Sequence, residues 1–252
     1  MGKKEKSENQ KALPKFGGIV LLGGIIGLFA GGVIGFFGGL FAPDQMIETI
    51  YHVLEVIEPY TIWMVAVFFT FLEVRLYSQA KEIYQKWDGE EENSIEKAEE
   101  KLSWVLVLTA AHMVLSFFLV GVDSIVRTEH HAVYLVTLLG FIAGIGSIII
   151  LQQKVIDLTK KINPEKKGSV YDTKFITVWM ESCDENEQKL IGQAAFKAYT
   201  IVSHSCVGIW LILFFISDLF HLGIMPITVV SIIWGILQIS YGYESIKLGK
   251  RK

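Results

Sequence analysis

Two histidines lie inside long apolar stretches, where an ionisable side chain is costly. His112 is near the middle of one apolar run, and His204 lies in another, flanked by Ser203 and Ser205. Ionisable groups within a membrane are rare and often functional. A neutral imidazole can bond to a backbone carbonyl or a hydroxyl group on a neighbouring helix, which would be a structural role. The alternative is a proton relay or a metal ligand.

Glu73 and Arg75 lie near the end of a further apolar run, and we expect them to pair or to extend toward the membrane surface. An intramembrane enzyme would use Glu73 together with His112 and His204. The sequence holds no metalloprotease motif, no phosphate-binding loop, no Ser-His-Asp order and no nucleic-acid signature. These features favour a protein that is not an enzyme and does not bind nucleic acid.

Further candidate ligands lie in the three links that follow the first, third and fifth apolar runs. These links hold four histidines and seven carboxylates, with Arg127 as their only basic residue. Imidazole and carboxylate groups suit zinc and other divalent cations. The alternative is that acidic residues are merely tolerated on that side of the membrane. The candidate metal cluster consists of His130, His131, Asp218 and His221. No other cofactor is indicated.

The composition is that of a membrane protein. Of 252 residues, 52% are hydrophobic and 19% are charged, below the roughly 25% charged residues of soluble domains. We predict an all-α fold with six transmembrane helices in a single polytopic domain over residues 1–252. The predicted spans are 16–41, 60–77, 103–122, 132–151, 198–217 and 226–243.

The first predicted span has no charge and ten glycines. Glycines four residues apart line one helix face and let a neighbouring backbone approach closely. We therefore expect a packing seam, although a Gly-rich lipid anchor is the alternative. The seam residues are Gly23, Gly27, Gly31, Gly35 and Gly39.

Residues 44–57 are amphipathic and predict an interfacial helix, which ends where Pro59 opens the second span. The domain divides into a polar tail (1–15), helices one to four (16–151), a polar segment (152–197), and helices five and six with a basic tail (198–252). Two helical elbows interrupt the spans. Asn93 with Glu96, and Asp184 with Glu187, have the form of capping signals that restart a helix.

The basic residues predict the orientation. Of the 23 Lys and Arg residues, 22 lie in residues 1–15, 75–101, 154–197 or the C-terminal tail, and Arg127 lies in one of the opposite links. Positive charge is enriched on the cytosolic side of membrane proteins. We therefore predict that both termini and both elbows are cytosolic, in the plasma membrane of a bacterium.

Residues 163–172 and 182–187, the latter followed by residues 194–199, are unusual for a linker. With the Gly-rich first run and six spans, they resemble a bacterial membrane family called domain of unknown function 3169, which occurs mainly in Gram-positive bacteria. The resemblance covers most of the chain and implies location and architecture. It implies no reaction, substrate or catalytic residue.

Two functions remain open. In the first, the protein is a non-enzymatic accessory subunit, sensor or protection factor that acts with a protein partner at segment 152–199. In the second, it is a small-solute or ion transporter with a polar path near His112 and His204. Contact with the lipid bilayer is expected in both, and an oligomer is compatible with both.

Overall fold

The computed structural model describes residues 43–126, 131–219 and 222–249, with six single positions between 18 and 32. Side chains within these ranges are described for 48–125, 134–217 and 222–249. The described residues form helices and no strand. The chain divides into two compact units, one of which is Glu48–Gly192 and the other Met1–Ile47 with Gln193–Lys252.

Five of the helices are long and apolar enough to cross a membrane. They cover Glu48–Lys86, Glu92–Ile125, Tyr134–Ile162, Glu185–Ser217 and Met225–Gly249. These five correspond to the second to sixth predicted spans, so the multi-pass helical architecture is confirmed to that extent. Apart from six single positions, the predicted first span lies outside the described residues, and so does its whole glycine seam, Gly23, Gly27, Gly31, Gly35 and Gly39.

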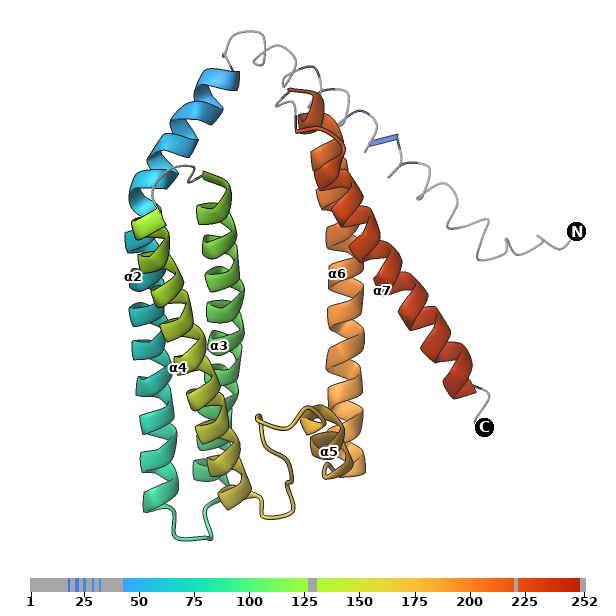
Figure 1. The fold of residues 1–252 in the computed structure, drawn as a ribbon. Helices are drawn as coiled ribbons and strands as arrows, with labels where there is room; N and C mark the ends of the chain where they lie inside the picture. Colours follow the sequence, from blue (N-terminus) through green and yellow to red (C-terminus); the bar gives the residue numbers. More distant parts are fainter. Residues whose placement is uncertain are drawn as a thin grey trace, which may run out of the picture. The chain divides into compact units, whose positions relative to one another are not determined.

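The unit Glu48–Gly192 is built on three long helices that lie side by side (Figure 1). They are α2 (Pro43–Lys86), α3 (Glu92–Val126) and α4 (His131–Ile162). Polar bonds join α2 to α4, as between Trp63 Nε1 and the carbonyl oxygen of Val136, 3.1 Å away. The three helices thus form one packed bundle.

The expected helix break at Pro59 is wrong. Pro59 lies inside α2, which continues from residue 43 to residue 86 as one helix of 44 residues. A proline removes one backbone hydrogen bond. Beside it, the hydroxyl of Thr61 donates to the carbonyl oxygen of Ile57. Ile62 is 1% exposed and packs with Trp63 against Gly140 of α4. This packing holds the helix together across the proline.

The first elbow joins α2 to α3. It contains Gly89 in the left-handed region at φ 91°, and Asp88 accepts hydrogen bonds from the backbone N–H groups of Glu90 and Glu91. Because α3 already begins at Glu92, the expected capping role of Asn93 with Glu96 is wrong. Asp88, five residues before Asn93, instead binds the backbone amides of the turn that leads into α3.

The second elbow contains the short helix α5 (Phe175–Glu181) and leads into α6 (Glu185–Leu219). The backbone N–H of Asp184 donates to Glu187, and the backbone N–H of Glu187 donates to Asp184, at 2.9 and 2.8 Å. The predicted capping signal is therefore confirmed here. These two reciprocal bonds fix the start of α6.

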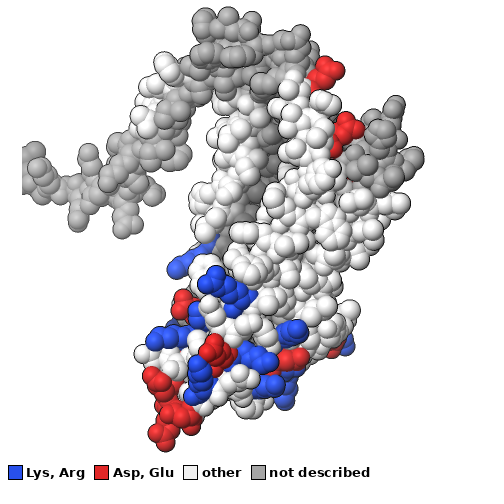
Figure 2. Space-filling view, turned by 90° about the vertical axis from the view of Figure 1, so that its left-hand side faces the viewer, with Lys and Arg blue, Asp and Glu red and all other residues white. Residues whose placement is uncertain are grey.

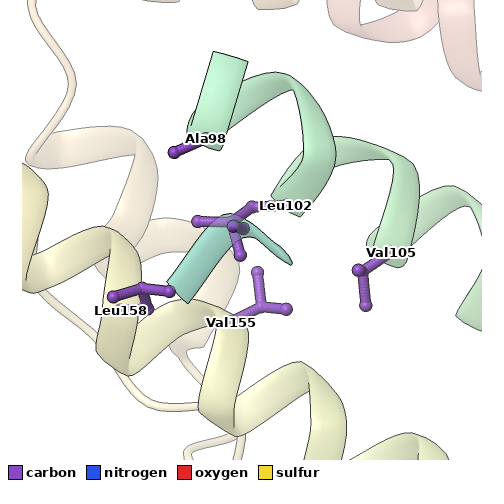
Figure 3. Close-up of a cluster of buried hydrophobic side chains, with 6 residues drawn as sticks. Ala98, Leu102, Val105, Val155 and Leu158 are labelled. Carbon is purple, nitrogen blue, oxygen red and sulfur yellow. The ribbon is translucent and has the colours of Figure 1, made fainter. Parts of the chain in front are cut away.

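The apolar core of this unit lies near the elbows. Figure 3 shows its side chains pointing toward one another from α3 and α4. The small residues Ala80 and Ala98 have no exposed surface and allow α2 and α3 to approach closely. The cluster consists of Ala80, Ala98, Leu102, Val105, Val155 and Leu158.

In the other unit, α6 packs on α7 (Met225–Gly249). The rings of Tyr199 and Tyr241 stack with centroids 4.3 Å apart. Gln238 of α7 accepts a hydrogen bond from the Tyr199 hydroxyl and donates one to Ser203, both on α6. One aromatic stack and one amide thus fix the pairing of these two helices.

Candidate functional site

The centre of the three-helix bundle holds a buried ionisable pair. Nδ1 of His112 on α3 and Oε1 of Glu73 on α2 lie 3.2 Å apart, and neither side chain is exposed. Placing a carboxyl group away from water is costly unless it is paired. The contact therefore gives each group the partner that its burial requires.

Packing fixes the position of the imidazole. The ring of Phe69 stacks on that of His112, with centroids 5.3 Å apart and planes inclined by 25°. On another side lies Gly144 of α4, where an added Cβ would sit 3.3 Å from Nε2 of His112. The histidine fits because position 144 carries no side chain.

Each member of the pair keeps one polar atom without a partner. Nε2 of His112 and Oε2 of Glu73 are buried, and neither has a hydrogen-bond partner in the described part of the chain. Buried polar atoms in folded proteins are usually satisfied. These two atoms are therefore the unsatisfied polar positions of the pair.

Other polar side chains line the interior of the bundle. Oγ1 of Thr137 donates to Glu58 at 3.0 Å, Nε2 of Gln152 donates to Thr109 at 3.2 Å, and Thr70 bonds Ser147 at 2.9 Å. Seven fully buried polar residues of α2, α3 and α4 form this polar interior, which stops at the apolar cluster near the elbows. They are Glu58, Glu73, Thr109, His112, Ser116, Asp123 and Thr137.

The structure changes two expectations about this region. Glu73 does not pair with Arg75, which is exposed, because the two residues project from different sides of α2. His112 bonds to a carboxylate, whereas the sequence suggested a carbonyl or hydroxyl partner. Residue types identified both members of the pair, but the sequence did not indicate that they meet.

His204 does not share in this pair. Its Nδ1 lies 2.7 Å from the carbonyl oxygen of Thr200 in its own helix, whereas the sequence suggested a partner on a neighbouring helix. Ser203 accepts a bond from Gln238, and Ser205 is exposed on α6. Within this group, Ser203 is thus the residue that takes part in the α6–α7 pairing.

The candidate metal cluster remains a prediction. The side chains of His130, His131, Asp218 and His221 lie outside the described residues. Among the residues that are described, no group of three His, Cys, Asp or Glu side chains could hold a metal ion.

A second polar site, which the sequence did not indicate, lies in the elbow. A groove of about 320 Å³ runs between α3, α4, α5 and the start of α6. There the buried Lys166 side chain contacts Glu187 directly, next to the buried thiol of Cys183. The only sequence signal was that Lys166 and Glu187 both fall in the stretches that carry the family resemblance.

The environment of Lys166 holds its ammonium group in the charged form. Burial lowers the pKa of Lys166, but the hydrogen bond to Glu187, together with the Glu187 charge and the neighbouring Cys183, outweighs burial. The pKa is therefore raised above its ordinary value. The contact acts as a charged link between the α4–α5 loop and α6.

These features define a multi-pass helical membrane protein with an ionisable pair in its interior. The chain belongs to the family described as Protein of unknown function (DUF3169), whose model matches residues 11–245. This confirms the resemblance seen in the polar stretches. No curated protein and no solved structure matches the chain.

Proposed function

We propose that this protein is a non-enzymatic membrane sensor that responds to protons and acts with a protein partner. The observation that carries the proposal is the contact of Glu73 with His112 in the bundle interior, with both side chains fully buried. Buried ionisable pairs are known to act as pH switches when a packing change accompanies protonation.

The switch uses only the two side chains. In one state the pair holds a single proton, shared between the carboxyl oxygen Oε1 and the imidazole Nδ1. Taking up a second proton leaves an uncompensated positive charge in an apolar interior, which is strongly unfavourable. The bundle would reduce this cost by separating α2 from α3 and admitting water to Nε2 of His112.

The elbow offers a surface for the partner. Ile176 on α5 is 82% exposed, and Tyr171 and Leu190 are also exposed apolar residues nearby. Apolar surface of this kind favours a binding role for segment 152–199. The alternative is that this segment lies as a helix on the membrane surface.

The proposal includes the predicted location. We infer that the protein lies in a bacterial plasma membrane, with six spans and with both termini and both elbows cytosolic. The concentration of Lys and Arg at the elbow end of the helices supports this orientation (Figure 2).

A pH-insensitive fluorophore on α2 tests the sensor. It would be attached at the exposed position Ser78 (Ser78→Cys), with Cys183 and Cys206 replaced by serine. Between about pH 5 and about pH 8, its emission should shift in the parent protein in liposomes. The shift should be lost in Glu73→Gln and retained in Glu96→Gln, which alters an exposed carboxyl of α3. A shift that survives Glu73→Gln would contradict the proposal.

The polar interior of the bundle supports a second candidate function, proton or ion transport. Polar residues from Glu58 to Thr109 could form a path across much of the membrane, although His204, expected to share that path, bonds within α6. Proteoliposomes with an internal pH dye separate the two functions. Proton flux that disappears in Glu73→Gln would favour transport, whereas absence of flux with a retained fluorescence shift would favour the sensor.

A further inference from the structure

A second groove lies at the elbow end of the bundle, between α2 and α4. It has a volume of about 250 Å³. Four residues of α2 and four of α4 line it, and within each helix they fall on successive turns of one face. The lining residues are Tyr77, Lys81, Tyr84, Gln85, Lys154, Asp157, Leu158 and Lys161. Leu158 belongs to the buried apolar core, so the groove borders that core.

The groove carries an excess of positive charge. It contains three lysines and one carboxyl group. That carboxyl group, on Asp157, accepts a hydrogen bond from Gln153 at 2.8 Å and lies 3.4 Å from Lys160, which is outside the groove. The single negatively charged group of the lining therefore interacts with two residues outside the groove.

The three groove lysines have no partner in the described part of the chain. Lys81, Lys154 and Lys161 make no ion pair and no hydrogen bond there. Lys166 in the neighbouring elbow groove is different, because it is neutralised by Glu187. Ammonium groups gathered around a cavity without a counter-ion attract an anion.

We propose that this groove, between the elbow ends of α2 and α4, binds a phosphate-bearing anion. Ammonium, phenol and amide groups are all donors to phosphate oxygens, and the groove supplies each kind. Basic pockets between membrane helices at the headgroup level are suited to anionic lipid headgroups. The same chemistry could also receive the phosphate of a soluble compound, and this proposal is independent of the proposed sensor.

Purified protein in neutral detergent micelles tests the site by native mass spectrometry. The probes are a phosphatidylglycerol, a phosphatidylcholine of equal chain length, and glycerol 3-phosphate as a soluble phosphate. The groove variant is Lys81→Gln/Lys154→Gln/Lys161→Gln. The matched control, Lys97→Gln/Lys174→Gln/Lys189→Gln, removes three exposed charges elsewhere in the same unit.

We expect the parent protein to retain phosphatidylglycerol in preference to phosphatidylcholine. The groove variant should bind phosphatidylglycerol at least about tenfold more weakly, since each lysine at the surface contributes to attraction of anionic lipid. The control variant should bind as the parent does. If glycerol 3-phosphate competes at similar concentration, the ligand is a soluble phosphate, and if it does not, the ligand is a lipid headgroup.

Two results would overturn the proposal. One is equal loss of binding in the groove and control variants, which would mean that only total charge matters. The other is that the parent protein binds neither phosphatidylglycerol nor glycerol 3-phosphate in preference to phosphatidylcholine. The single variant Lys154→Gln gives a lesser change in case the triple variant fails to fold, and it too should weaken binding more than Lys97→Gln does.

Discussion

Glu73 and His112 lie on different helices and 39 residues apart in the sequence, yet their side chains meet at 3.2 Å with no exposed surface. The contact joins α2 to α3 at the level where Gly144 of α4 leaves room for the imidazole ring. Residues of all three helices of the bundle therefore pack together at this level.

Removal of either partner should destabilise the bundle. Truncating one member of a buried ion pair typically costs about 3–5 kcal/mol, because the other is left uncompensated. We expect Glu73→Ala and His112→Ala each to lower the midpoint of thermal unfolding in detergent. The double variant should lose less than the sum of the two, and Glu96→Ala should have little effect. Strict additivity would contradict a direct energetic coupling.

The space beside the imidazole should not tolerate a side chain. At Gly144 an added Cβ would meet His112 at 3.3 Å and both Ala66 and Ser116 at 3.6 Å, whereas at Gly146 it would meet nothing within 4 Å. Gly144→Leu should cost about 1–3 kcal/mol through overpacking. Gly146→Leu, in the same helix, should be nearly silent. Similar folded yields of the two variants would show that α4 does not pack as described.

The contact of Lys166 with Glu187 should stabilise the elbow below strongly alkaline pH. The pKa of Lys166 is raised above its ordinary value of 10.5, so the folded state holds the proton more tightly than the unfolded state does. Its stabilisation is therefore fully present below pH 10.5 and is lost as pH rises through the higher folded pKa.

The variant Lys166→Met measures this contribution. Because Glu187 is 38% exposed, we expect a loss of only about 1 kcal/mol at neutral pH by denaturant titration. The difference between parent and variant should stay constant to about pH 10 and shrink above it. A stability difference that grows with pH would contradict the raised pKa of Lys166.

The predicted orientation can be tested at two described positions. Ile224, in the link between α6 and α7, is 80% exposed, and Glu90 in the first elbow is exposed. With Cys183 and Cys206 replaced, Ile224→Cys should react with an impermeant thiol reagent on whole cells. Glu90→Cys should react only after permeabilisation, and the reverse pattern would show that the orientation is inverted. Native Cys183 is a poor reporter because it is buried.

The sequence by itself determined the helical, multi-pass character of the protein. Five predicted spans correspond to observed helices, because apolar length and turn residues act locally. The capping of α6 by Asp184 with Glu187 was also predictable, since it involves residues only three apart. The break expected at Pro59 was wrong, because packing of Ile62 and Trp63 on α4 outweighs a local preference.

Only the tertiary structure decided which polar residues meet. The side chain of Glu73 contacts His112 and not Arg75. Three lysines from α2 and α4 line one groove. Such contacts depend on how far each helix is rotated and shifted against its neighbour. Helical periodicity specifies which residues share a face of one helix, but the packing of side chains between helices sets the rotation that brings two faces together.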